Sequence, residues 1–205
     1  MKKNYKIYVS ITVFLALISI ILWQFFYYNS LNENSLAYIN QLSRLTGVGF
    51  LTSQHIHADF KIYVNGAMID LNKIELQAPE FASLEFWSDA NTSKFVHLHE
   101  GETNKDVMHV HATGISLAMF LRAVSGKISQ SCVNFPKIIS NREFCDEKNK
   151  TLRVFINGVK SNAPQDYEIK DMDKILISYG NDSDAQVSMQ IKSIGNNACI
   201  QSGKC

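Results

Sequence analysis

The amino-terminal part of the chain is dominated by one apolar segment, whereas the remainder mixes apolar and polar positions. Residues 7–28 contain no charged side chain. At about 1.5 Å per residue, a helix of this length would span a hydrocarbon core of about 30 Å. We therefore predict a transmembrane helix over 7–28.

The alternative is a cleaved signal peptide, but its apolar region would be about 7 to 15 residues long and would end at small residues. Here the segment ends in "LWQFFYYNS", an aromatic cluster typical of membrane interfaces.

A weaker helical periodicity follows the apolar segment. Large aliphatic residues recur every three positions at Leu36, Ile39, Leu42 and Leu45, and Gly47 is suited to ending a helix. We predict a stalk over 29–53 and one folded domain over 54–193, which is long enough for a single hydrophobic core. Residues 194–205 form a short tail.

Two stretches of the domain share one pattern. "FKIYVNG" at 60–66 and "LRVFING" at 152–158 both alternate apolar and polar β-formers and end in Asn-Gly. Asn-Gly after such a run is a strong hairpin signal, because a type I′ turn needs positive φ at both central residues. We predict a hairpin at each stretch. Whether the match reflects an internal duplication stays open.

One clear helix is predicted between these hairpins. Its apolar stripe is Leu117, Phe120, Leu121 and Val124, with Ser116 placed to cap its start and Gly126 placed near its end. The stripe should pack on a sheet. "KILISY" at 174–179 is typical of a buried strand, and we predict a further strand at "QVSMQI", 186–191. The order indicates an α+β fold with a mixed or antiparallel sheet, and it resembles the order of a β-grasp fold.

The most unusual feature is the distribution of histidine. All six histidines lie in three His-x-His pairs, at 55–57, 97–99 and 109–111, whereas random placement would give about 0.2 pairs. Residues two apart in a strand share a face. In each segment, "HIHADFKIYV", "FVHLHE" and "VMHVHA", the alternate positions are mainly apolar. We therefore predict three strands, each with a core side and a histidine side.

The last two pairs should lie on neighbouring strands, because the polar "EGETNKD" between them is typical of a hairpin connection. Opposed side chains on paired antiparallel strands are about 5 Å apart at Cβ, so imidazoles from both strands can converge on one ion. The predicted metal ligands are His97, His99, His109 and His111, joined by His55 and His57, with Asp59 as a ligand or as an acceptor that orients an imidazole. The alternative is a polar sheet face without metal.

Imidazole nitrogens suit Zn²⁺ and Cu²⁺, so we expect a copper or zinc ion, and six ligands could also hold two ions. The rest of the chain offers no recognisable substrate pocket, so whether the chain is an enzyme stays open. Met108 occupies the core side of its strand and gives no support to thioether ligation of Cu⁺.

Charge and cysteine usage indicate the compartment. Lys2, Lys3 and Lys6 precede the apolar segment, and the next basic residue is Arg44. The positive-inside bias then predicts a single-pass protein of the cell membrane, with its N-terminus in the cytoplasm and its C-terminal domain outside. The exterior part carries a formal charge of −2, which argues against nucleic-acid binding.

The four cysteines, Cys132, Cys145, Cys199 and Cys205, fit an oxidising exterior and are most simply two disulfides. Sequence allows three connectivities, of which we expect nearest-neighbour pairing. Cys132 and Cys145 flank a polar, proline-containing loop. A thiol-redox role is the alternative, although the C-x-x-C of thioredoxin-like enzymes is absent.

The succession "HIHADFKIYVNG", "FVHLHEG", "MHVHATGISLAMFL", "DMDKILISYG" and "ACIQSGKC" resembles a family of single-span, exported proteins of archaea and small-genome bacteria. Members are sometimes labelled protein-disulfide isomerase. The resemblance covers the apolar segment and most of the domain. It implies the same topology and the same histidine and cysteine pattern, and it implies no established activity.

Three functions follow as hypotheses. The first is a membrane-anchored protein that captures, buffers or delivers copper or zinc outside the cell, with a membrane enzyme as a possible partner. The second is an enzyme in which three histidines hold the ion and water takes the fourth position, as in carbonic anhydrase. The third is a disulfide-linked structural or thiol-redox module whose metal only stabilises the fold. We favour the first.

Overall fold

The computed structural model describes residues 13–30, 47–71, 95–98, 106–124, 126–136 and 139–205. The chain divides into two compact units, Met1–Ser43 and Arg44–Cys205. In the first unit, a helix over Val13–Ser30 is long and apolar enough to cross a membrane by length and composition, a test that a signal sequence also passes. The start of the predicted 7–28 helix and most of the predicted stalk lie outside the described residues.

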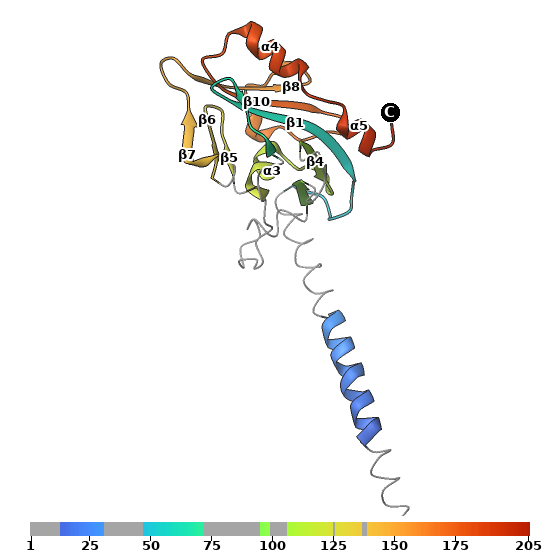
Figure 1. The fold of residues 1–205 in the computed structure, drawn as a ribbon. Helices are drawn as coiled ribbons and strands as arrows, with labels where there is room; N and C mark the ends of the chain where they lie inside the picture. The colour runs from blue at the N-terminus through green and yellow to red at the C-terminus, as the bar shows by residue number, and fades with distance from the viewer. Residues whose placement is uncertain (1–12, 31–46, 72–94, 99–105, 125, 137–138) are drawn as a thin grey trace, which may run out of the picture. The chain divides into compact units, whose positions relative to one another are not determined.

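The second unit is α+β, as predicted. Its described strands are β1 (Ile56–Val64), β2 (Ala67–Met68), β3 (Val96–Leu98), β4 (Val107–Val110), β5 (Lys127–Ile128), β6 (Cys132–Phe135), β7 (Ser140–Cys145), β8 (Thr151–Ile156), β9 (Val159–Lys160) and β10 (Lys174–Gly180). Its described helices are α3 (Leu117–Ala123), η2 (Pro164–Asp166), α4 (Asp184–Lys192) and α5 (Asn197–Gln201). Figure 1 shows their arrangement.

The main sheet, within the described residues, has the order β3-β4-β1-β10-β8-β9, with β2 paired to β1. β1 runs parallel to β10 and antiparallel to β4. Both Asn-Gly hairpins are confirmed: β1 turns into β2 at Asn65 and Gly66, with φ of 49° and 77°, and β8 turns into β9 at Asn157 and Gly158, with φ of 51° and 81°. These are the left-handed conformations that a type I′ turn requires. The β-grasp comparison stays a prediction.

One face of the main sheet carries the apolar core. Ala58, Phe60 and Ile62 alternate along β1, and each is almost fully buried. Helix α3 covers this face, as its stripe predicts, with the Phe120 ring packed edge-on against Phe60 at a centroid distance of 5.0 Å. The helix begins where expected, because the Ser116 hydroxyl accepts a hydrogen bond from the Met119 backbone.

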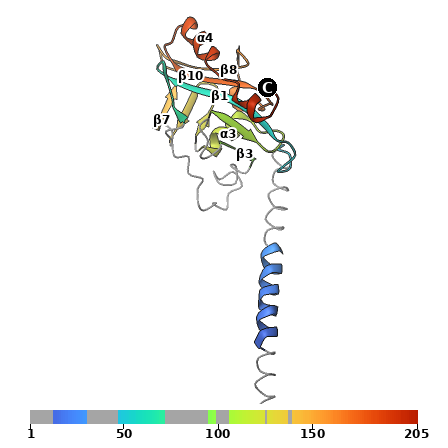
Figure 2. The same ribbon diagram turned by 45° about the vertical axis from the view of Figure 1, so that its right-hand side comes forward.

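Helices α4 and α5 lie on the opposite face of the sheet from α3 (Figures 1 and 2). On α4, Val187 packs with Leu176 of β10 and with Ile194 beyond the helix. The side chain of Lys61 on β1 reaches the Ser193 carbonyl at 2.8 Å. The sheet is therefore covered on both sides, and residues 184–205 supply the second cover.

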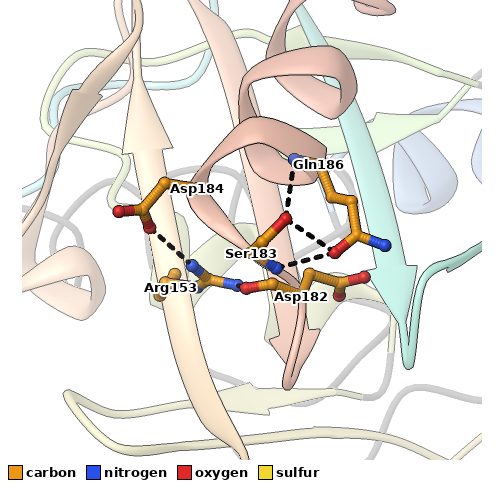
Figure 3. Close-up of polar contacts among 5 residues, drawn as sticks. All are labelled: Arg153, Asp182, Ser183, Asp184 and Gln186. Carbon is orange, nitrogen blue, oxygen red and sulfur yellow. Dashed lines mark hydrogen bonds and ion pairs between the residues drawn. The ribbon is translucent and has the colours of Figure 1, made fainter.

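The strand predicted at 186–191 is wrong, because these residues belong to α4. Figure 3 shows the physical reason at the start of the helix. The Ser183 hydroxyl accepts from the Gln186 backbone, while the Gln186 side chain accepts from the Ser183 backbone at 2.8 Å. This reciprocal capping satisfies the first amides of a helix. Arg153 of β8 also contacts Asp184 at 3.3 Å.

A second, three-stranded sheet has the order β5-β6-β7. The segment between Cys132 and Cys145, predicted as a loop, includes the paired strands β6 and β7. The two cysteines lie directly opposite each other on these strands. Val133, Phe135 and Phe144 are buried there. Both disulfides join the predicted pairs, Cys132–Cys145 and Cys199–Cys205. The described cysteines are therefore all oxidised.

The end of the predicted stalk belongs with the second unit. The Gly49 amide donates to the Thr113 carbonyl at 2.8 Å, and the Thr52 amide donates to the His111 carbonyl at 2.7 Å. The Gln54 side chain donates to the Ala112 carbonyl at 2.6 Å. Residues 49–54 therefore hold residues 111–113, which follow β4, and position His111. The other domain boundaries stay predictions.

Candidate metal centre

Three adjacent strands bring one histidine from each predicted pair into line. In the pairing of β1 with β4, His57 lies opposite His109. In the pairing of β3 with β4, His97 lies opposite the same His109 from the other side. Directly opposed residues share a face of the sheet. The register therefore places three imidazoles side by side, with the His109 ring between the other two.

Two more histidines flank this row. His55 precedes β1 and His111 follows β4. We call His55, His57, His97, His109 and His111 the histidine cluster. Its ring centroids are separated by 4.3 Å for His57–His109, 5.8 Å for His97–His109, 5.0 Å for His97–His111, 4.8 Å for His55–His111 and 4.8 Å for His55–His57. The five rings thus form a closed circuit of neighbours.

Within the cluster, His55, His57 and His109 could hold a metal ion, and we call them the three-histidine group. One nitrogen from each lies within 4.8 Å of the others. Ligands at about 2.0 to 2.1 Å in a tetrahedral site are about 3.3 Å apart, so small ring rotations would complete the geometry. His57 and His109 are buried, with 7% and 4% exposure, whereas His55 is exposed. The group is therefore buried on one side and open on the other.

The buried side is covered by the chain's C-terminal tail. Gln201 Oε1 lies 2.8 Å from His109 Nε2. A carbonyl oxygen only accepts, so this His109 nitrogen carries the proton and its lone pair is on Nδ1. Ser202 Oγ lies 2.7 Å from His57 Nδ1. When that nitrogen carries the proton, the lone pair of His57 is on Nε2. Such contacts fix the orientation and tautomer of metal-binding imidazoles.

The backbone of His57 is held separately. Its amide donates to Asp171 Oδ1 at 3.2 Å, and its carbonyl accepts from the Met172 amide at 2.8 Å. Partial burial raises the pKa of Asp171, but hydrogen bonds from Lys204 and from the His57 amide outweigh it, so the pKa lies below its usual range. Asp171 also forms an ion pair with Lys204 of the tail. One carboxylate therefore links β1 to the tail.

Asp59 lies on the same face of β1 as His57, as predicted. It is buried, with 3% exposure, and its Oδ1 accepts from the Ala198 amide at 3.0 Å. Burial raises the pKa of this carboxyl. The contact joins β1 to the start of α5. The role of Asp59 as a ligand or an orienting acceptor stays a prediction.

The structure therefore brings together most of the histidines that the sequence singled out. His55, His57 and His109 form the three-histidine group, and His97 and His111 are ring neighbours on the same face. His99 lies outside the described residues. The prediction that its pair faces the 109–111 pair is confirmed for His97 alone.

Sequence reasoning missed the tail's side chains. Gln201 and Ser202 contact histidines 92 and 145 positions away. Nothing in their local pattern indicates these contacts. The one available hint is that two cysteines, six residues apart, enclose both residues in a short loop.

Comparisons with known protein families, characterised proteins and solved structures give no match. We therefore infer the function from the geometry of the histidine cluster and of the tail residues that contact it.

Proposed function

We propose that this protein is a membrane-anchored, extracytoplasmic metal-binding protein that captures, buffers or delivers copper or zinc. The observation that carries the proposal is the three-histidine group, whose nitrogens lie within 4.8 Å of one another. Three neutral nitrogen donors at this spacing are what Zn²⁺ and Cu²⁺ accept. His97 and His111 provide further nitrogens for the same ion or for a second one.

The available donors narrow the choice of metal. The described cysteines are oxidised, so they supply no thiolate. Met108 is fully buried on the core side of β4, away from the histidine face. Hard ions such as Mg²⁺ and Ca²⁺ prefer oxygen ligands. An imidazole site therefore favours zinc and copper, and raw affinity favours Cu²⁺.

The anchoring part of the proposal is supported by the N-terminal helix, by Lys2, Lys3 and Lys6 before it, and by the two disulfides. Positive residues favour the cytoplasmic side, and disulfides persist in oxidising compartments. Together they support a single span with the domain outside. A membrane-protein partner would then receive or supply the ion.

The uneven burial of the three-histidine group supports a carrier. His57 and His109 are held beneath the tail, whereas His55 is exposed. An exposed ligand can leave the ion first and let an incoming ligand take its place. A closed structural site would bury all its ligands, so the arrangement favours exchange.

An enzyme is the second candidate, because three protein nitrogens leave a fourth position for water. A bound Zn²⁺ lowers the pKa of such water to about 7. Carbon dioxide hydration and ester hydrolysis by the zinc-loaded protein would test this candidate. Rates no higher than those of the His109→Gln variant would exclude it.

The main test is titration of the full-length protein, purified in detergent, with Zn²⁺ and with Cu²⁺. The variants are His55→Ala and His109→Gln, with Lys160→Ala as the control at an exposed position of β9. Both histidine variants should bind at least about 10-fold more weakly, since each removes a ligand. The Lys160 control should match the wild type. Equal affinity in all four proteins would contradict the proposal.

A further inference from the structure

The C-terminal tail is built to cover the histidine cluster. Figures 1 and 2 show α5 and the C-terminus beside β1 and β4. Ala198 of α5 is fully buried, and its amide donates to the buried Asp59. Gln201 at the end of α5 and Ser202 directly after it have side chains that contact His109 and His57. The tail therefore packs against β1 and β4 on the histidine face and supplies polar contacts to two imidazoles of the cluster.

These two contacts lie inside a covalent loop. The Cys199–Cys205 disulfide encloses both Gln201 and Ser202. Within the loop, the Lys204 amide donates to the Cys199 carbonyl at 3.0 Å, and the Gly203 amide donates to the Ile200 carbonyl at 3.0 Å. A helix of five residues has little stability of its own. The disulfide therefore restricts the conformations that the tail can adopt once it leaves the sheet.

The two disulfides differ in what would remain after they open. Cys132 and Cys145 are opposite residues on β6 and β7, so the strand ladder still holds their segments together. Cys199 and Cys205 are in α5 and at the chain's end, outside any strand, and Cys205 is exposed. A reductant can therefore reach Cys205. Once the bridge is open, only noncovalent contacts hold the end of the tail, among them the Lys204–Asp171 ion pair and the Ser202–His57 hydrogen bond.

We propose that the Cys199–Cys205 disulfide is a redox switch for metal binding, an inference that rests on the function proposed above. When the bridge is closed, Ser202 and Gln201 hold the His57 and His109 rings in the orientation that binds the ion. When it is open, the tail loosens, both rings lose these contacts, and the ion is released through the side where His55 is exposed.

The reductant that the switch requires is a dithiol, such as the active centre of an exported thiol oxidoreductase. Its thiolate attacks Cys205 Sγ and breaks the S–S bond, so that Cys199 leaves as a thiolate and takes up a proton. The second thiol of the reductant then attacks the mixed disulfide and releases Cys205 as a thiol. Two electrons and two protons pass to the protein, and the dithiol becomes a disulfide.

The decisive experiment compares two variants that each lack one bridge. The full-length protein in detergent, Cys199→Ser/Cys205→Ser and Cys132→Ser/Cys145→Ser are titrated with Zn²⁺ in competition with a chromophoric chelator. Serine removes the bridge without adding a thiolate ligand. Loss of contacts that orient metal-binding histidines costs about 10- to 100-fold in affinity. We expect that loss for the 199/205 variant and a change of less than about 2-fold for the 132/145 variant.

Wild-type protein that binds Zn²⁺, together with an unchanged 199/205 variant, would overturn the switch and leave the proposed function standing. Equal weakening in both double variants would also overturn it, because the effect would then be general destabilisation. A wild type that binds neither Zn²⁺ nor Cu²⁺ would overturn both proposals.

Single substitutions at Gln201 and Ser202 test the same contacts without opening the bridge. With the bridge intact, Gln201→Leu and Ser202→Ala should weaken Zn²⁺ binding. Gln201→Glu, which keeps an accepting oxygen, should bind Zn²⁺ as the wild type does. Long-range ¹H–¹⁵N spectra of the imidazoles should show His109 protonated on Nε2 in the wild type and in Gln201→Glu. A tautomer unaffected by Gln201→Leu would overturn the positioning role.

The order in which the bridges open provides an independent test. The protein is incubated with increasing concentrations of a small dithiol, alkylated, and mapped by mass spectrometry. Cys199 and Cys205 should become alkylated at lower dithiol concentrations than Cys132 and Cys145. Simultaneous opening, or the reverse order, would contradict a switch in the tail.

Discussion

The two faces of strand β1 come from alternate residues of one nine-residue segment, yet they serve different purposes. The side chains of Ala58, Phe60 and Ile62 are buried in the apolar core, where the Phe60 ring packs against Phe120 of α3. His57 and Asp59 point to the other face and meet the tail through hydrogen bonds. The apolar face contributes stability through buried area, whereas the histidine face contributes a site through fixed polar geometry.

Burial alone does not distinguish the structural face of β1 from its functional face. His57, Asp59 and His109 are nearly as buried as the core residues behind them. Burying polar groups costs free energy unless their hydrogen bonds are satisfied. The tail supplies such bonds to all three residues. Substitutions on the two faces should therefore have separable effects on stability and on metal affinity.

Breaking the apolar face should have the largest effect. Phe120→Ala removes a fully buried ring that packs against Phe60. It should lower the free energy of unfolding by about 3 to 5 kcal/mol. Thermal unfolding followed by near-ultraviolet circular dichroism would measure this. The Zn²⁺ affinity of the protein that remains folded should stay within about 3-fold of the wild type. A selective loss of affinity without destabilisation would contradict the division between faces.

Breaking the histidine face should reverse this balance. His55→Ala removes an exposed ring that belongs to the three-histidine group. It should weaken metal binding about 10-fold or more, while the metal-free protein keeps its unfolding temperature because no cavity is created. Calorimetric titration and thermal unfolding on the same samples would show both effects. Destabilisation without loss of affinity would mean that His55 is a surface residue only.

Adding metal should stabilise the folded protein only when the histidine ligands are present. A ligand present at 100 times its dissociation constant stabilises the folded state by about 2.7 kcal/mol. Zn²⁺ should therefore increase the free energy of unfolding of the wild type and of Phe120→Ala by similar amounts. Both proteins should unfold at a higher temperature when Zn²⁺ is present. His109→Gln should gain much less, because it lacks a ligand. An equal gain in His109→Gln would indicate binding elsewhere.

Much of this contrast could be predicted from sequence because it depends on local alternation. The period of two in "HIHADFKIYV" assigns the faces of β1, and Asn65-Gly66 fixes the hairpin that follows. The pairing of the last two histidine segments followed from the polar connection between them. These features involve residues close together in the chain, and steric rules specify them directly.

The errors have identifiable physical causes. The alternating "QVSMQI" suggested a strand, but Ser183 and Gln186 form the reciprocal cap that starts α4. That spacing was readable in the sequence and outweighs a short alternation. The tail's contacts with His57 and His109 could not be read, because they depend on how distant segments dock in three dimensions.

Lowering the pH should affect the histidine face before it affects the apolar face. Protons compete with the metal for neutral imidazoles, so affinity should fall as the pH drops through roughly 6.5, the ordinary histidine value. The pKa of Asp171 is lowered in the folded protein. Its carboxylate therefore contributes stability that is present above the pKa of the unfolded chain and is lost only as the pH falls through the folded pKa. Its contact with the tail therefore persists at pH 5.5. Titrations at pH 7.5 and 5.5 should differ in affinity without loss of fold. Identical affinities would contradict imidazole ligation.

Asp59→Asn should have the smallest effect. Burial raises the pKa of Asp59, so the site favours an uncharged group. Asparagine keeps an oxygen that can accept from the Ala198 amide. We expect the unfolding free energy to change by less than about 1 kcal/mol and Zn²⁺ affinity to stay within about 3-fold. A fall of 10-fold or more in affinity would instead make Asp59 a metal ligand.

If the histidine face holds a metal ion, the protein purified from cell membranes should already contain that ion. Full-length wild type and His55→Ala/His109→Gln would be purified from membranes without chelators, and their copper and zinc measured by elemental mass spectrometry. The wild type should retain about one ion per chain or more, and the double variant should retain almost none. Equal metal content in the two proteins, or none in the wild type, would contradict the claim.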